Sequence, residues 1–143
     1  MSQSAMTNTL FVYGSLRKGF HHPAYQYISG HFDFIGPATV KGLLYDMGEF
    51  PAAIPAATDK QIIGEVYALK DPAEFGWVFA QLDDYEGVDP AEGETPSYRR
   101  DLVMAQCGDT QQECWVYWYC GSVDGKPLIP SGDVLEYRNN KYN

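Results

Sequence analysis

Glu86 is the side chain whose position best suits acid and base chemistry. It comes at or just past the end of an amphipathic helix, in the run LDDYEG. Leu82 and Tyr85 are expected to point to the core, which aims Glu86 into a cleft at the helix terminus. Asp83 and Asp84 are expected to face solvent. The negative end of the helix dipole and the two nearby acids would favour a protonated carboxyl, which suits a general acid or base near neutral pH. The plain alternative is an ordinary surface glutamate.

A second candidate is the turn that follows the apolar run LFVY, within Leu10 to Gly19 (LFVYGSLRKG). Gly14 permits unusual backbone angles there. The N–H groups of Ser15, Leu16 and Arg17 would then point outward as a small anion-binding nest. The turn lacks the second glycine of a serine-esterase elbow and the Gly-Lys-Ser/Thr ending of a phosphate-binding loop. It is therefore either a structural corner or a cradle for an anionic substrate.

The run SYRRDLV supplies a third group of polar side chains at the start of a strand. Tyr98 could stack or donate a hydrogen bond in a pocket, and Arg99 or Arg100 could pair with a carboxylate. Because side chains alternate along a strand, one arginine is expected to face inward and the other outward.

Metal and disulfide chemistry are not expected. Three cysteines, Cys107, Cys114 and Cys120, are an odd number, so a secreted disulfide framework is disfavoured, and no histidine lies near them. We expect buried or partly buried structural thiols. His21 and His22 have no third ligand at a suitable spacing and are interpreted as loop residues.

Composition limits the partners. The 143 residues carry a net charge of -9, which disfavours nucleic acid and an anionic membrane surface. No apolar run reaches the roughly 20 residues of a membrane helix, and the first residues show no targeting pattern, so a cytoplasmic protein is expected. We expect one domain over 1–143, with 1–8 a loose segment and 134–143 a peripheral tail, as a monomer or homodimer.

The clearest helix is predicted over 71–87, in DPAEFGWVFAQLDDYEG. Asp71 takes the cap position, Pro72 the first helical position, and Glu74 completes a reciprocal cap. Gly87 is the stop signal. Apolar residues at helical spacing predict one buried face: Phe75, Val78, Phe79, Leu82 and Tyr85.

The other segments predict strands and one short helix. HPAYQYISG suggests a helix with Pro23 in its first turn and Gly30 after its end, and the stretch 32–48 suggests strands broken at Gly36-Pro37 and Gly48. Further strands are expected at 61–69, where Gly64 indicates a bulge or close packing, and in two antiparallel runs joined near Gly108-Asp109. The fold class is therefore α+β, a small mixed, barrel-like sheet flanked by short helices.

Taken in order, FVYGSLRKG, GEVYAL, LDDYEG, YRR and IPSGDV resemble the gamma-glutamylcyclotransferase-like superfamily, from about Phe11 to Asp133. Short length and the Tyr-x-Arg strand are most similar to the gamma-glutamylamine cyclotransferase branch. The resemblance implies that Tyr13, Gly14, Ser15 and Leu16 bind a glutamyl group, that Glu86 is the acid and base, and that Tyr98 lines the pocket.

The resemblance also implies a reaction that needs no cofactor or metal. The α-amine of a gamma-glutamyl amide attacks its own γ-carbonyl and releases 5-oxoproline and an amine. The connection over 88–96 is longer and more acidic than is typical of this branch. Gamma-glutamyl amino acids or glutathione-like peptides are therefore alternative substrates, and a non-catalytic module that binds a small metabolite is an alternative function.

Overall fold

The structure is a computed structural model that describes residues 7–14, 17, 24–48, 50–57, 59–88 and 92–137. Among these residues, seven strands and two α-helices follow one another along the chain. In order, the elements are β1 (Thr9–Val12), α1 (Ala24–His31), β2 (Phe32–Lys41), β3 (Leu43–Asp46), β4 (Pro51–Ile54), β5 (Gln61–Leu69), the 3₁₀ turn η2 (Pro72–Glu74), α2 (Phe75–Glu86), β6 (Tyr98–Cys107) and β7 (Thr110–Tyr119).

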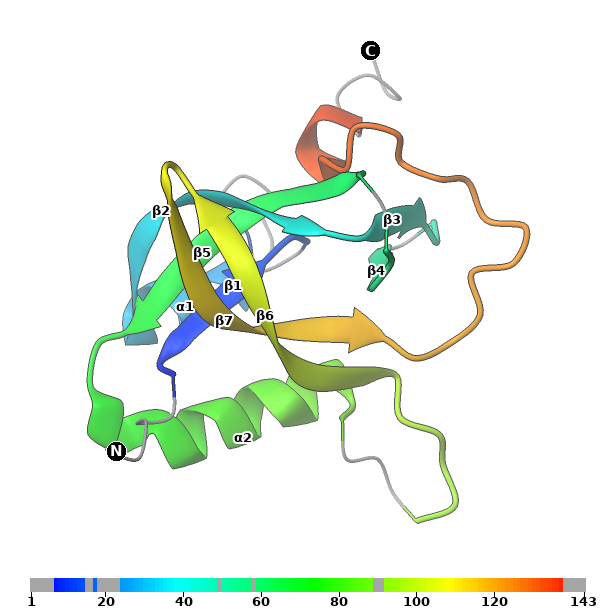
Figure 1. Cartoon of the computed structure of the whole chain (residues 1–143). Helices are drawn as coiled ribbons and strands as arrows, with labels where there is room; N and C mark the ends of the chain where they lie inside the picture. The colour runs from blue at the N-terminus through cyan, green and yellow to red at the C-terminus, as the bar shows by residue number, and fades with distance from the viewer. Residues whose placement is uncertain are drawn as a thin grey trace.

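Five of the strands form a closed barrel in the order β1-β5-β2-β6-β7 (Figure 1). The β1–β7 pair, which joins Leu10 and Trp115, is parallel, and the other pairs are antiparallel. This confirms the predicted α+β class with a mixed, barrel-like sheet. Strands β3 and β4 form a separate two-stranded sheet, whose β4 lies near β7.

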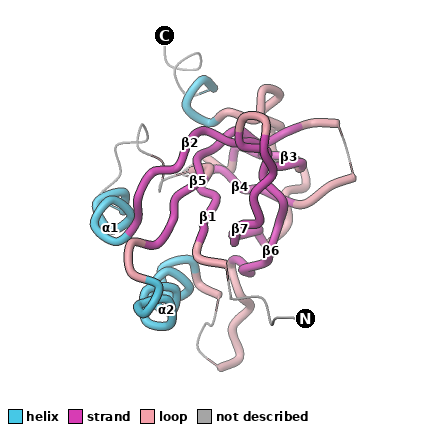
Figure 2. The backbone as a smooth tube through the Cα atoms, turned by 60° about the vertical axis from the view of Figure 1, so that its left-hand side comes forward, coloured by secondary structure: helices cyan, strands magenta, loops and turns pink. Residues whose placement is uncertain are grey.

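Helices α1 and α2 lie on the same side of the barrel (Figure 2). The predicted apolar face of α2 is confirmed in its middle, where Val78, Phe79 and Leu82 are buried, but Tyr85 is 50% exposed and that part of the prediction is wrong. Gly87 ends the helix in the left-handed region at φ 76°, as expected. Of the helices that the described residues form, none is long and apolar enough to cross a membrane.

The start of α2 differs from the predicted reciprocal cap. Asp71 accepts a hydrogen bond from the Ala73 N–H at 3.0 Å, and residues 72–74 form a 3₁₀ turn before the α-helix begins. The Glu74 carboxylate lies 3.8 Å from His31 Nδ1 on α1. The cap residue is therefore confirmed, and Glu74 connects the two helices.

Two predicted boundaries are wrong. Strand β2 continues through Gly36 and Pro37, because a shift in register after Phe34 absorbs the irregularity. The break comes at Gly42, where a Cβ atom would lie 2.8 Å from the Ile54 carbonyl oxygen. Gly30 lies inside α1 and does not follow its end.

The C-terminal residues up to 137 pack against the rest of the structure, so 134–137 are not a loose tail, and 138–143 lie outside the described residues. The N–H groups of Asp46 and Ile63 donate to the carbonyls of Pro127 and Gly132, each at 2.8 Å. Val134 is 3% exposed and belongs to the core. In Figure 1 this segment leaves β7 in orange and passes outside β3 before its red helical turn.

The thiols are free, and their burial only partly matches the prediction. Cys114 is buried and Cys107 is half-buried, as expected, but Cys120 is exposed just after the end of β7. His21 and His22 lie outside the described residues.

Candidate functional site

One pocket brings together residues from five separate segments. Its cavity of about 50 Å³ is lined by Phe11, Val12, Tyr13, Gly14, Phe50, Pro51, Glu86, Tyr98 and Tyr117. The four described residues that the sequence singled out therefore meet around one space: Tyr13, Gly14, Glu86 and Tyr98. Ser15 and Leu16 lie outside the described residues, so their place in the turn stays a prediction.

Glu86 supplies the only carboxyl group among the described residues of the pocket lining. It is the last residue of α2. Burial raises the pKa of Glu86 from 4.5 to about 7. The helix end and the neighbouring acids, which the sequence suggests as the cause of a raised pKa, are the wrong explanation, because desolvation causes the shift. Within the described ranges, no cation lies within ion-pair distance of this carboxyl.

Three tyrosines surround the carboxyl. Burial raises the pKa of Tyr13, Tyr98 and Tyr117 above the usual phenol value, so all three remain protonated near neutral pH. The Tyr13 hydroxyl donates to the Tyr117 carbonyl at 2.5 Å, which joins β1 to β7. The carboxyl is a titratable group, and the phenol oxygens can accept hydrogen bonds. The hydroxyl protons of Tyr13 and Tyr117 are already donated, to the Tyr117 carbonyl and to Asp83.

Gly14 follows Tyr13 where the chain leaves β1. The Arg17 N–H donates to the Gly14 carbonyl at 2.9 Å and closes a tight turn. Gly14 does not adopt a positive φ, so the predicted reason for a glycine is wrong. A Cβ atom on Gly14 would lie 3.0 Å from Pro51 Cγ, so the close approach of β4 leaves little room for a side chain here.

The Arg17 side chain ties this turn to β5 and to the C-terminal segment. The side chain is buried, with Nη1 2.9 Å from an Asp133 carboxylate oxygen and Nε 3.5 Å from Glu65 Oε2. Nη1 also donates to the Ile63 carbonyl at 3.4 Å. Local sequence patterns point only to the backbone N–H of Arg17, because the Asp133 partner of its side chain lies 116 positions away.

The two arginines of β6 face opposite ways, as strand alternation predicted. Arg100 is half-buried and pairs with Asp83, whereas Arg99 is exposed and pairs with Asp101 at 2.7 Å. Asp84 is exposed as expected, but Asp83 does not face solvent, which corrects that prediction.

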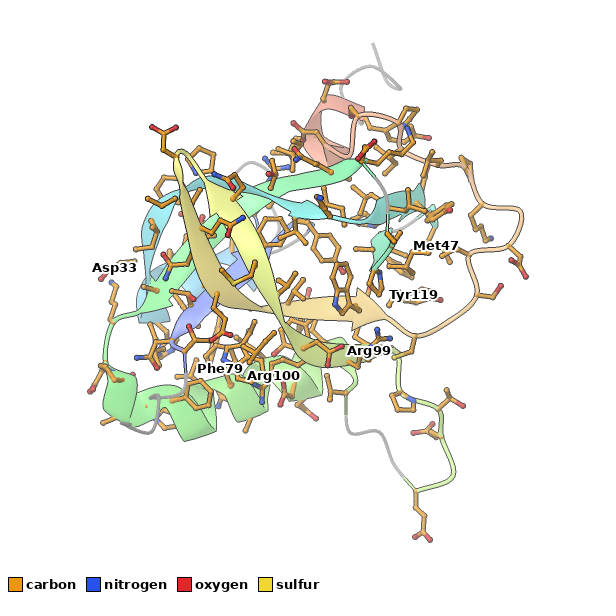
Figure 3. The ribbon with its side chains drawn as sticks, viewed as in Figure 1. Asp33, Met47, Phe79, Arg99, Arg100 and Tyr119 are labelled. Atoms are coloured by element: carbon orange, nitrogen blue, oxygen red, sulfur yellow. The ribbon has the colours of Figure 1, made fainter. Side chains whose placement is uncertain are left out.

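The rings of Phe50, Tyr98 and Tyr119 pack together, and because Phe50 and Tyr98 line the pocket we call this cluster the aromatic mouth of the pocket. The Tyr119 ring lies 5.8 Å from the Phe50 ring and 5.5 Å from the Tyr98 ring. Figure 3 shows Tyr119 at the end of β7. No signal in the sequence marks Phe50 and Pro51, which follow a turn at Gly48 and reach the pocket only because β4 packs beside β7.

A second groove, of about 400 Å³, lies between β2, β5 and β6. It contains none of the predicted site residues, and Lys41 is the one charged residue among its described lining. Across the described residues, no three His, Cys, Asp or Glu side chains are grouped so that they could hold a metal ion. The smaller pocket therefore remains the candidate site.

Curated relatives match most of the chain. It is 30% identical over 128 residues to the gamma-glutamylcyclotransferase family protein YtfP of Escherichia coli K12, covering 89% of this chain and 96% of YtfP. It is also 30% identical over 135 residues to a putative gamma-glutamylcyclotransferase of Methanocaldococcus jannaschii, covering 90% of this chain and 97% of that protein.

Among solved structures, YkqA from Bacillus subtilis has the same fold, with a TM-score of 0.71 and 23% identity. The match covers 96% of this chain and 44% of YkqA. The family model for gamma-glutamyl cyclotransferase, AIG2-like, matches residues 10–137, a range that contains every described residue of the pocket. The chain therefore belongs to the gamma-glutamyl cyclotransferase, AIG2-like family.

Proposed function

We propose that this protein is a gamma-glutamyl cyclotransferase that releases 5-oxoproline and a free amine from a gamma-glutamyl amide, with Glu86 as general acid and base. The observation that carries the proposal is the half-buried Glu86 carboxyl, whose desolvation raises its pKa to about 7, in a pocket bordered by a tight glycine turn. A general base works best when its pKa lies near the working pH. Membership of the family supports the reaction class.

The pocket chemistry fits an intramolecular reaction. The substrate α-amine attacks its own γ-carbonyl carbon, so a new C–N bond closes the five-membered ring and the old γ-amide C–N bond breaks. Holding the glutamyl group in a folded shape can contribute about 7–11 kcal/mol to such a reaction. The turn that begins at Gly14 would hold the substrate oxygen atoms, with the predicted N–H groups of Ser15 and Leu16.

Glu86 would move the proton that this reaction transfers. A peptide α-amine has a pKa of about 7.7–8.0 and arrives mostly protonated. An ionised Glu86 accepts one proton, which frees the amine to attack. The resulting carboxylic acid gives this proton to the departing nitrogen. The carboxylate then takes the second proton from the ring nitrogen and passes it to the released amine, so the lactam keeps one N–H and Glu86 ends as it began. Transfers of this type contribute typically about 10²- to 10⁴-fold to the rate.

The leaving group distinguishes the alternatives. Gamma-glutamyl amines carry an uncharged or cationic leaving group, whereas gamma-glutamyl amino acids and glutathione-like peptides carry a further carboxylate. The pocket mouth formed by Phe50, Tyr98 and Tyr119 is aromatic, and the next loop holds the exposed acids Glu92 and Glu94. These loop acids and the net charge of -9 repel an anionic leaving group at long range, which supports the gamma-glutamyl amine as substrate.

The test measures 5-oxoproline released from gamma-glutamyl-lysine, gamma-glutamyl-alanine and glutathione. Wild-type protein is compared with Glu86→Gln, and Asp84→Asn is the matched control because it removes an exposed charge from the same helix. We expect Glu86→Gln to lose at least about 10²-fold in kcat with an unchanged circular dichroism spectrum. Release that persists in this variant would refute the role of Glu86. Binding of these compounds without release from any of them would favour the metabolite-binding module.

A further inference from the structure

We propose that Asp83 is a positioning residue, which with Arg100 and Tyr117 holds the last turn of α2 so that Glu86 stays inside the pocket. The inference deepens the proposed function and rests on it, because it assigns a support to the proposed acid and base. Asp83 lies three residues before Glu86, about one helical turn away.

The Asp83 carboxylate accepts three hydrogen bonds from two strands. Arg100 Nε donates to Oδ1 at 2.7 Å, and Nη2 donates to Oδ2 at 3.1 Å, which forms a bidentate pair. The Tyr117 hydroxyl donates to Oδ1 at 2.7 Å. The side chains of Asp83 and Arg100 are only 16% and 19% exposed, so this is not a solvated surface pair.

Aromatic rings hold the guanidinium in place. The Arg100 Cζ atom lies 4.4 Å from the centre of the Trp115 ring, 5.1 Å from Phe79 and 6.0 Å from Phe75. Figure 3 shows Arg100 and Phe79 close together between β6 and α2. An arginine that is stacked on rings and bonded through both nitrogens has little freedom to move, so it fixes Asp83 in turn.

Asp83, Arg100 and Tyr117 lie on α2, β6 and β7, the three elements that contribute Glu86, Tyr98 and Tyr117 to the pocket lining. Asp83 shares α2 with Glu86, Arg100 lies two positions after Tyr98 on β6, and Tyr117 itself lines the pocket from β7. Their bonds therefore join the helix end to both strands. A shift of about 1 Å at a catalytic group can cost about 10²-fold in rate, so this junction bears directly on turnover.

The titratable groups that face Glu86 come from each packed element. They are Tyr13 from β1, Tyr98 from β6 and Tyr117 from β7, while β4 contributes the uncharged Phe50 and Pro51. Since burial is what raises the pKa of Glu86, any change that lets this helix end move into water should lower that pKa.

The experiment compares two pairs of matched variants. Asp83→Asn is compared with Asp84→Asn, and Arg100→Gln is compared with Arg99→Gln, because the second member of each pair is exposed. The pKa of Glu86 is measured on the full chain by carboxyl ¹³C NMR, which needs no turnover. The values of kcat and KM for 5-oxoproline release are measured in parallel.

We expect Asp83→Asn and Arg100→Gln each to lower the Glu86 pKa by about one unit, and kcat by about 10- to 100-fold with a smaller change in KM. The exposed controls should leave both values unchanged. If the pair acted only through its charges, Asp83→Asn would lower the pKa and Arg100→Gln would raise it. Opposite shifts, or no shift with only a lower melting temperature, would overturn the positioning role.

A third variant and the wild-type activity itself distinguish the remaining outcomes. Tyr117→Phe removes one of the three bonds and keeps the ring, so it should give a smaller shift in the same direction and serves if Asp83→Asn does not fold. An unchanged pKa in Tyr117→Phe would count against the inference. If wild-type protein releases no 5-oxoproline, the proposed function fails, while the NMR shifts still decide whether Asp83 positions Glu86.

Discussion

The two walls of the pocket are held in different ways. The turn wall, which we define as Tyr13, Gly14 and Arg17, is supported from behind by Asp133 in the C-terminal segment. The helix wall, defined as Glu86 with Asp83, is supported by Arg100 from the next strand along the chain. The partners in the turn wall, Arg17 and Asp133, are 116 positions apart in the sequence. Asp83 and Arg100, the ion pair of the helix wall, are only 17 positions apart.

The difference also concerns the chemistry that each wall offers. The turn wall brings the backbone close to Pro51, and it presents Tyr13, whose pKa is raised by burial so that its hydroxyl stays protonated near neutral pH. The helix wall presents a carboxyl whose protonation changes in that range because it is buried. We infer that one wall determines how the substrate is held and the other determines when a proton moves. The predictions below test that separation.

The largest effect on folding is expected from Arg17→Met. The substitution leaves the carboxylates of Glu65 and Asp133 without their common cation, which should lower the free energy of unfolding by about 3 kcal/mol. Urea denaturation measures the loss, and Arg99→Met is the control because its pair is exposed. In the enzyme assay KM should rise more than kcat falls. An equal loss in the free energy of unfolding in both variants would show that Arg17 stabilises the fold no more than an exposed arginine does.

The next effect is on the pH dependence of stability. The folded-state pKa of Glu86 is raised from 4.5 to about 7, so ionising this group is easier in the unfolded chain. Its contribution is therefore fully present below pH 4.5 and is lost as the pH rises through 7. Relative to Glu86→Gln, wild-type protein should lose up to about 3 kcal/mol over that window. Unfolding curves at pH 4.5, 6 and 7.5 measure it, and a constant difference would contradict it.

Gly64→Ala should disturb the turn wall from the side of β5. A Cβ atom there would lie 2.2 Å from the Val12 carbonyl oxygen, so β1 must move, at a cost of about 1–3 kcal/mol. Gly76→Ala in α2 is the control, because its Cβ atom meets nothing within 4 Å and alanine favours a helix. Thermal denaturation should show opposite shifts in the melting temperature, and a stable Gly64→Ala would show that β1 adjusts freely.

The smallest effect on stability is expected from Phe50→Ala at the mouth of the pocket. Phe50 is 38% exposed, so the variant should lose only about 1 kcal/mol. Phe50 nonetheless contacts the Tyr119 ring, and its loss should narrow the difference in kcat/KM between gamma-glutamyl-lysine and gamma-glutamyl-alanine. An unchanged ratio would place the leaving group away from this aromatic mouth.

Much of the fold could be predicted because it follows from short-range patterns. The strand at 61–69, the helix that Asp71 caps and Gly87 ends, and the hairpin near Gly108 follow from alternation, helical spacing and turn residues. The predicted break at Gly36-Pro37 failed because pairing with β5 keeps β2 continuous. Tertiary pairing there outweighed the local turn signal.

The candidate site could be predicted only in part. Motifs identified Tyr13, Gly14, Glu86 and Tyr98, and the structure brings these four around one pocket. Phe50, Pro51 and Tyr117 could not be found in this way, because ordinary aromatic and apolar residues carry no chemical signal. They become pocket residues only through the packing of β4 and β7.

The sequence by itself determined the short-range features of this protein: the strand at 61–69, the helix that ends at Gly87, the hairpin near Gly108, and the order of motifs that indicates the family. These depend on neighbours within a few positions. Only the tertiary structure decided that Asp83 turns inward to Arg100, that Arg17 meets Asp133, and that Glu86 is desolvated. The physical reason is that burial and charge pairing depend on side chains that the folded barrel brings together from distant parts of the chain.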